Sequence, residues 1–158
     1  MKRELVVIVH NVRSLHNVGS VFRTADAVGA SKIYLTGITP APLDRFNRVR
    51  PQIAKVALGA ERTMPWEKAA LLSKLVMHLK KEGYCIVAVE QSKKSKPYYS
   101  LPKKYKKVVV ILGSETEGLS LRDLKLVDII LEVPMHGSKE SLNVSVAAGI
   151  VLFRLRYN

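Results

Sequence analysis

The chain has 158 residues, 47% of them hydrophobic and 25% charged, which is the composition of a globular domain and argues against a disordered chain. Lysine and arginine number 26 against 13 acidic residues, and the resulting net charge of +13 indicates a polyanionic partner such as nucleic acid, the alternative being a basic surface that only aids solubility. The lone Cys85 cannot form an intramolecular disulfide, and no apolar run approaches the roughly 18 residues of a membrane span, so we expect a soluble, cytoplasmic protein without membrane contact.

The predicted elements alternate between strands and helices. In chain order they are a strand over Glu4 to His10, a helix from about Asn17 to Gly29, a strand over Ser31 to Thr36, an amphipathic helix over Trp66 to Glu82, strands over Tyr84 to Val89, Lys107 to Leu112 and Asp128 to Val133, and a helix from about Leu142 to Arg156. This order predicts an α/β fold, a mostly parallel sheet flanked by helices, in a single domain over residues 1–158. The last helix is apolar nearly all round, which predicts burial against its own sheet, a partner subunit or both.

In open parallel sheets, ligands bind beyond the carboxyl ends of the strands, and three polar segments follow predicted strands there. The first contains Asn17, Gly19 and Arg23. Asn17 suits a helix N-cap, and a glycine one turn before an arginine leaves open backbone beside a guanidinium, which suits a phosphate. The alternative is an ordinary capped helix with a surface pair between Arg23 and Asp26.

The second segment, Gly113 to Ser120, follows the fourth predicted strand and carries two glycines and two carboxylates, Glu115 and Glu117. Such a loop can wrap a ligand closely through its backbone. The glycine-rich patterns that bind phosphates or dinucleotides do not occur in the chain. The alternative is a turn with a glutamate at a helix start.

The third segment, Val133 to Ser145, places polar side chains at the start of the apolar last helix. Ser141 alone could be an N-cap. Asn143 lies further into the predicted helix, where asparagine is a mediocre helix former, so we favour a functional role for it.

Two further groups of residues bear on ligands. The four histidines and Cys85 show no ligand spacing, so we expect no metal. Seven lysines from Lys93 to Lys107 alternate with tyrosines, which is typical of a patch that tracks a nucleic-acid backbone, the alternative being a solvated lysine loop.

Taken together, the three segments resemble the motifs of the TrmH/SpoU family of RNA 2′-O-ribose methyltransferases in the SPOUT superfamily. The first family motif, N-x-G-x-x-x-R, is matched by Asn17, Gly19 and Arg23. The second, G-x-E-x-x-G-L-S, is matched over Gly113 to Ser120, and the third, P-M-x-G…S-L-N-V-S-V-A, over Pro134 to Ala147. The resemblance extends over nearly the whole chain, from Leu5 to Arg156.

The resemblance implies a fold, a methyl donor and partners. The C-terminal part of the sheet would form a deep trefoil knot. S-adenosylmethionine would lie bent in the knot, held by main-chain groups around Gly113, Val133, Met135 and Leu142. The chain is similar to the minimal members of the family. These would be homodimers with the C-terminal helix at the interface, and the dimer itself would have to bind the RNA. From the excess positive charge, we expect the RNA backbone to be held from both subunits by Arg45, Arg48, Arg50 and the lysines from Lys93 to Lys107, with Lys93 and Lys94 among them.

By the same resemblance, the catalytic cluster is Asn17, Arg23, Glu115, Ser141 and Asn143. The family arginine is often assigned as the general base, but a guanidinium is effectively always protonated, so Arg23 could instead clamp an RNA phosphate while Ser141 and Asn143 orient the 2′-OH. The substrate is tRNA or rRNA, with small size favouring tRNA. The alternative function is a non-catalytic knotted RNA-binding protein that acts as an assembly or chaperone factor, which the intact cluster argues against. A base methyltransferase of a related knotted family is disfavoured by the S-L-N motif.

Overall fold

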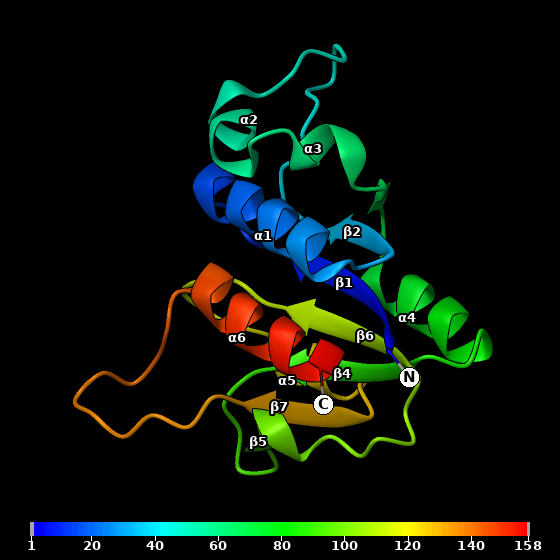
Figure 1. The fold of residues 1–158 in the computed structure, drawn as a ribbon, viewed down its shortest axis with the longest axis vertical. Helices are drawn as coiled ribbons and strands as arrows, with labels where there is room; N and C mark the ends of the chain where they lie inside the picture. The colour runs from blue at the N-terminus through cyan, green and yellow to red at the C-terminus, as the bar shows by residue number, and fades with distance from the viewer. Residues whose placement is uncertain (1, 158) are drawn as a thin grey trace.

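All strands of the sheet run parallel, as the alternating pattern predicts. A computed structural model describes residues 2–157, and within them one seven-stranded sheet has the order β3-β2-β1-β6-β4-β7-β5 (Figure 1). The elements are β1 (Glu4–His10), α1 (Leu15–Val28), β2 (Lys32–Thr36), α2 (Pro51–Ala57), α3 (Ala60–Thr63), β3 (Trp66–Ala69), α4 (Leu72–Lys81), β4 (Cys85–Val89), β5 (Lys96–Pro97), the 3₁₀ helix η1 (Tyr98–Ser100), β6 (Lys107–Leu112), α5 (Leu121–Leu124), β7 (Ile129–Glu132) and α6 (Val144–Tyr157). The mostly parallel sheet flanked by helices is therefore confirmed, whereas the deep knot stays a prediction.

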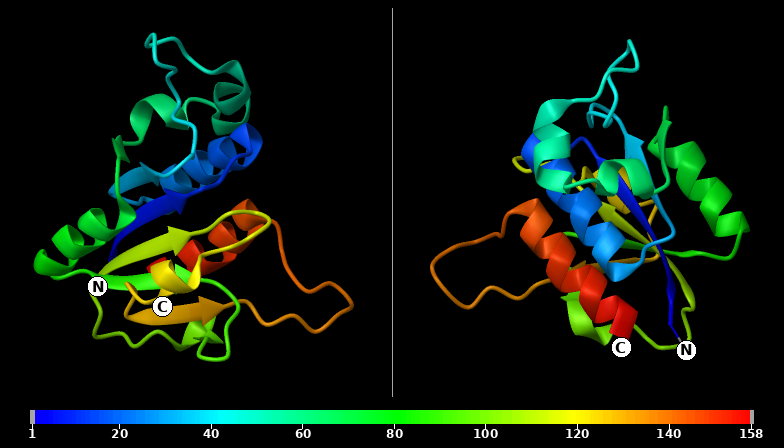
Figure 2. Two further views of the ribbon diagram at one scale, coloured as in Figure 1. Left: turned by 180° about the vertical axis from the view of Figure 1, so that it is seen from behind. Right: turned by 45° about the horizontal axis from the view of Figure 1, so that its top comes forward.

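The strands pack into one apolar core on each face of the sheet, because successive side chains of a strand point to opposite faces. Leu5, Val7 and Val9 of β1 pack into the core that α1, α2, α3 and α6 cover, and Val6 and Ile8 pack into the core under α4 and α5. Figure 2 shows α1 and α6 side by side on the first face. Within residues 2–157, no helix has the length and apolarity needed to cross a membrane.

The amphipathic segment after Pro65 divides into a strand and a helix, where the sequence predicts one helix from Trp66. Trp66 to Ala69 form the edge strand β3, which pairs with β2 from Ile33 to Thr36. Periodicity alone does not separate a short strand from the first turn of a helix, and here pairing with β2 decides. The helix begins at Leu72, and its apolar side chains pack as predicted.

Two predicted helix starts are also displaced, and both displacements affect polar residues of interest. Helix α1 begins at Leu15, and Ser14, not Asn17, is its N-cap: the Ser14 side chain accepts the Asn17 N–H. The predicted end is confirmed, because Gly29 adopts the left-handed conformation, with φ of 69°. Helix α6 begins at Val144, not Leu142, which places Asn143 immediately before the helix. The N-cap role predicted for Asn17 is therefore wrong, whereas the functional role predicted for Asn143 stays a prediction.

Helix α6 is buried on one side only. The buried residues are Ala148, Val151, Leu152 and Leu155. Phe153 and Tyr157 stay exposed, with their rings stacked at a centroid distance of 6.3 Å. The sheet and α1 thus cover one side of the helix, and an aromatic side remains open in the single chain.

A buried arginine joins the start of the chain to its end. Arg3 is only 2% exposed, and its guanidinium donates to the carbonyls of Tyr105 at 2.9 Å, Leu155 at 2.8 Å and Pro102 at 3.1 Å. Arg156 of α6 donates in return to the Arg3 carbonyl. These bonds hold the last turn of α6 against the entry to β1.

We expect Arg3→Met to lower the free energy of unfolding by about 3 kcal/mol, because the methionine leaves several buried carbonyls without donors. Urea denaturation measures the change. The control is Lys2→Met at the exposed neighbouring residue, which should stay within about 0.5 kcal/mol of the unchanged protein. Equal stability of the two variants would show that the Arg3 contacts contribute nothing.

Candidate active site

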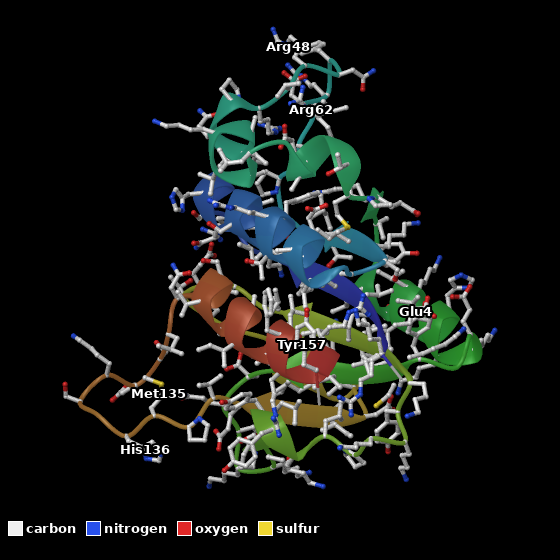
Figure 3. The ribbon with its side chains drawn as sticks, viewed as in Figure 1. Glu4, Arg48, Arg62, Met135, His136 and Tyr157 are labelled. Carbon is white, nitrogen blue, oxygen red and sulfur yellow. The ribbon has the colours of Figure 1, made fainter. Side chains whose placement is uncertain are left out.

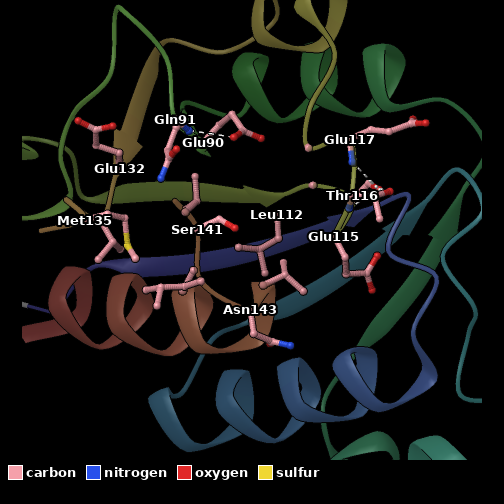
Figure 4. Close-up of a pocket in the computed structure, with 18 residues that line it drawn as sticks. Glu90, Gln91, Leu112, Glu115, Thr116, Glu117, Glu132, Met135, Ser141 and Asn143 are labelled. Carbon is pink, nitrogen blue, oxygen red and sulfur yellow. Dashed lines mark hydrogen bonds between the residues drawn. The ribbon is translucent and has the colours of Figure 1, made fainter. Parts of the chain in front are cut away.

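The carboxyl ends of β6, β4 and β7 meet around a cavity of about 300 Å³ (Figure 4). The segment 133–143 arches away from the sheet after β7 and returns to begin α6 (Figure 1). Glu115 and Asn143 lie at one end of the cavity, and Glu132 and Met135 lie at the other. The second and third segments that the sequence singles out therefore converge, as their positions after parallel strands predict.

All four residues predicted to hold a methyl donor line this cavity: Gly113, Val133, Met135 and Leu142. The loop after Gly113 closes on itself through a hydrogen bond from the Gly118 N–H to the Ser114 carbonyl, at 3.0 Å. A Cβ at Gly113 would lie 2.8 Å from the Gly118 backbone, so only glycine allows this approach. The glycines thus shape the wall of the cavity.

Part of the cavity follows β4, outside the three segments that the sequence singles out. Val89, Glu90 and Gln91 line it, and the Glu90 carboxylate accepts the Leu119 N–H at 3.0 Å, which ties β4 to the loop after β6. The Gln91 side chain donates to the carbonyl of Glu140 in the segment 133–143. The sequence does carry a signal for these residues, because the polar Glu90 and Gln91 come directly after the predicted strand that ends at Val89.

A chain of hydrogen bonds joins the three segments. The Asn17 side-chain N–H donates to Glu115 Oε1 at 3.1 Å, and Asn17 Oδ1 accepts from the Asn143 amide at 3.1 Å. Asn143 Oδ1 in turn accepts the Ser145 N–H at 2.8 Å, as the N-cap of α6. Since a carboxylate only accepts, Glu115 determines how both amides are oriented. The capping that the sequence analysis assigned to Asn17 and considered for Ser141 thus belongs to Ser14 and Asn143.

Glu115 is held in its ionised form. Burial opposes ionisation, but hydrogen bonds from its own N–H, from the Asn17 amide and from the Ser14 and Arg13 N–H groups outweigh that effect, and the pKa of Glu115 is lowered from its ordinary value. Near neutral pH this carboxylate is therefore charged, and it accepts the hydrogen bond that orients Asn17 and, through Asn17, Asn143.

The remaining two predicted catalytic residues differ in position. Ser141 lines the cavity. Arg23 is exposed on α1, six residues beyond Asn17, and the helical rise puts its Cα about 9 Å further along the axis. It does not line the cavity of its own chain. Within residues 2–157, no ion pair joins Arg23 to Asp26, so the surface pair considered as an alternative is not formed.

Gly19 has a packing role in place of the open phosphate site that the sequence predicts. It is buried under α2, and a Cβ there would lie 2.7 Å from the Ile53 carbonyl oxygen. The glycine therefore lets α1 and α2 approach closely, and its backbone is not open to a phosphate.

The cavity is acidic although the chain is strongly basic. Four glutamates line it: Glu90, Glu115, Glu117 and Glu132. Such a lining attracts a cationic ligand and repels phosphate. Among the residues that the structure describes, no group of three or more His, Cys, Asp or Glu side chains is placed to hold a metal ion.

The predicted RNA-binding residues fall into two separate groups along the edge of the sheet. Arg45 and Arg48 are exposed in the segment after β2, and Lys93 and Lys94 are exposed in the segment after β4, with β1 and β6 between these strands. Arg50 differs, because it is half-buried and its Nε has no hydrogen-bond partner in the described part of the chain.

Comparison with known proteins identifies the family. A model of the SpoU rRNA Methylase family matches residues 4–153, so the chain belongs to this family, as the motifs predict. A 23S rRNA (guanosine-2′-O-)-methyltransferase, RlmB, from Neisseria meningitidis serogroup B is 32% identical over 153 residues, which are 96% of this chain and 58% of that protein. The chain thus spans about three fifths of the length of this curated relative.

Solved structures resemble the whole described fold. The AdoMet-bound rRNA methyltransferase from Sinorhizobium meliloti has a TM-score of 0.88 at 29% identity, covering 99% of this chain and 57% of that one. The TrmH/SpoU tRNA modifying enzyme from A. aeolicus has a TM-score of 0.83 at 29% identity, covering 98% of this chain and 76% of that one. The fold is therefore that of the SpoU methyltransferases.

We expect Glu115→Gln to lower the free energy of unfolding more near pH 7 than near pH 4. A carboxylate whose pKa is lowered in the folded state stabilises that state above the ordinary pKa, and this contribution is lost as the pH falls toward the folded-state value. Urea denaturation at the two pH values measures the difference.

The matched control is Glu117→Gln, which removes a carboxylate from the same loop but leaves the bonds to Asn17, Ser14 and Arg13 intact. A loss for Glu115→Gln that does not change between the two pH values would contradict the role of its ionised form.

Proposed function

We propose that the protein transfers a methyl group from S-adenosylmethionine to a ribose 2′-OH of RNA. The observation that carries this proposal is the chain of hydrogen bonds from Glu115 through Asn17 to Asn143 at one end of the acidic cavity. Membership of the SpoU family and the names of the relatives support it.

The cavity has the chemistry that this donor requires. S-adenosylmethionine carries a sulfonium cation, which suits the four lining glutamates, and the close-packed glycine loop presents backbone groups to a ligand. Gly113, Val133, Met135 and Leu142 would hold the donor. When bound, it supplies a methyl group that is already activated by the positive sulfur.

The protein then has to position the ribose, whose 2′-oxygen would bond to the methyl carbon as the carbon–sulfur bond of the donor breaks and the hydroxyl proton passes to water. Ser141 and Asn143 lie where cavity and helix α6 meet, and we assign them the orientation of the 2′-OH. Glu115 and Asn17 fix the Asn143 amide, so they act as positioning residues. We assign Arg23 to an RNA phosphate, because a guanidinium binds phosphate in a bidentate manner and does not give up its proton. Alignment of this kind can lower a barrier by several kcal/mol.

The names of the relatives favour rRNA over tRNA as the substrate. The curated relative is named for 23S rRNA, although one similar structure is described as a tRNA modifying enzyme. We therefore propose that the substrate is rRNA, with tRNA as the second candidate. We also propose that the protein acts in the cytoplasm. The cavity and the hydrogen bonds from Glu115 through Asn17 to Asn143 argue against the alternative of a non-catalytic RNA chaperone, because a chaperone would not need them.

We also propose that the protein acts as a homodimer through the open side of α6. Val146, Phe153 and Tyr157 are exposed on this helix, and a second copy of the chain would cover them. Because α1 packs against α6, a partner docked there would lie near the exposed Arg23.

Methyl transfer from labelled S-adenosylmethionine to separate rRNA and tRNA pools tests the activity, with nuclease digestion and nucleoside mass spectrometry to identify the product. We expect a 2′-O-methylnucleoside in one pool. Arg23→Lys should largely abolish transfer, because lysine keeps the charge but loses the bidentate geometry. Near-normal turnover of that variant would contradict the phosphate role, and a chain that neither binds the donor nor methylates RNA would overturn the proposed function.

Light scattering on the protein as it elutes from a size-exclusion column tests the homodimer. We expect a dimer for the unchanged chain and a monomer for Phe153→Asp, because a charge cannot be buried in an apolar contact without a partner. Met77→Asp, on the exposed side of α4, is the control and should leave the dimer intact. A monomeric unchanged chain would refute this proposal.

A further inference from the structure

The segment after β2 ends in a rigid, exposed turn, which we call the arginine turn and define as residues 43–49. Leu43 and Val49 form an antiparallel bridge at its base. The Asp44 side chain accepts the N–H groups of Phe46 at 2.8 Å and Arg48 at 3.0 Å, and Asn47 adopts a positive φ of 59°. The turn forms the far tip of the molecule, where Figure 3 labels Arg48.

The arginine turn presents an aromatic ring to solvent beside two cationic side chains. Phe46 is 61% exposed, and the guanidinium carbons of Arg45 and Arg48 lie 4.7 and 4.9 Å from its ring centroid. Arg48 Nε also donates to Asp44 Oδ2 at 2.9 Å. Hydrogen bonds, first that from the Arg48 N–H, lower the pKa of Asp44, so the turn keeps its carboxylate ionised near neutral pH. Ring and guanidinium groups are therefore organised before any ligand arrives.

The methyl-transfer site makes no use of this unit. Phe46 does not line the cavity. Strand β2, from which the segment leaves, is two strands away from β6, which is about 10 Å along the edge of the sheet. Within one chain, whatever the arginine turn binds therefore lies outside that chain's own cavity.

The chemistry of the turn matches an unpaired RNA base. Guanidinium groups attract the phosphates, and an aromatic ring or a guanidinium plane offers a surface on which a base stacks. In a continuous duplex both faces of a base are covered by its neighbours, so such stacking requires a nucleotide that is single-stranded. A contact to a duplex backbone alone would use the arginines and would leave an exposed phenyl ring without a role.

We infer that the arginine turn stacks an unpaired base of the substrate RNA, with Phe46 as the specificity-determining residue, at a nucleotide some distance from the one methylated. The substrate is then a loop or single-stranded stretch, not a continuous duplex. This inference rests on the proposed function in naming the RNA as its substrate, but it can be tested by binding alone.

The test compares the binding of the 158-residue chain to a stem-loop RNA and to a fully paired duplex of the same length. We expect Phe46→Ala to weaken stem-loop binding about 5- to 150-fold, the range expected for one lost stacking contact, with little change for the duplex. Phe46→Trp should restore binding. Met77→Ala, which truncates a similarly exposed apolar side chain on α4, is the control.

Salt dependence separates stacking from charge. Phe46→Ala should leave the salt slope of stem-loop binding unchanged, whereas Arg48→Gln should reduce it by about one phosphate contact. Equal loss for stem-loop and duplex, or no loss for either, would overturn the inference. Loss of the dimer in Phe46→Ala would also overturn it and assign the turn to a second copy of the chain.

A kinetic measurement distinguishes this inference from the proposed function. If the chain methylates RNA, Phe46→Ala should raise KM for RNA while kcat at saturating RNA stays unchanged, because the contact is remote from the reacting atoms. A fall in kcat with KM unchanged would contradict a remote contact. A chain that binds stem-loops through Phe46 but transfers no methyl group would refute the proposed activity and leave the stacking site standing.

Discussion

The carboxylate of Glu115 joins parts of the chain that lie far apart in sequence. Asn17 is 98 residues before Glu115 and 126 residues before Asn143, yet the three side chains form one hydrogen-bonded chain. They meet because the described strands run parallel, so the segments after β1, β6 and β7 all leave the sheet at one edge. As a pure acceptor, Glu115 orients the Asn17 amide, which orients the Asn143 amide, which begins α6. The start of the last helix and one end of the cavity therefore depend on a single ionised group.

Charge is separated between the inside of the cavity and the outer surface. Glutamates line the cavity, while the exposed arginines and lysines lie in segments beyond it. The proposed cationic methyl donor and polyanionic RNA would thus be attracted to different places on one edge of the sheet. Within the cavity wall, the close approach of Gly113 to Gly118 brings backbone within reach of a ligand, and Glu90 holds that loop from the neighbouring strand.

The sequence predicts five of the seven described strands, leaving out β3 and β5, and it predicts some local roles poorly, for physical reasons. Continuous β-branched runs such as Glu4 to His10 have no alternative to burial in a parallel sheet. Trp66 to Ala69 read as helix because four residues carry too little periodicity, and only pairing with β2 makes them a strand. Gly19 reads as open backbone because sequence does not show that α2 covers it. The sequence does not single out Glu90 and Gln91 after β4, because two polar residues at the end of a strand are common.

The sequence by itself determined the α/β class and the order of the three motifs, because hydrophobic period and motif spacing are local properties of the chain. The residues that line the cavity after β6 and β7 followed from the family that these motifs resemble. Only the tertiary structure decided which polar groups pair. Ser14 and Asn143 act as the caps, Asn17 bridges Glu115 and Asn143, and Arg23 stays outside the cavity of its own chain. A hydrogen bond requires two groups within about 3 Å in a suitable orientation, and for residues a hundred positions apart that distance is set by how strands and helices pack.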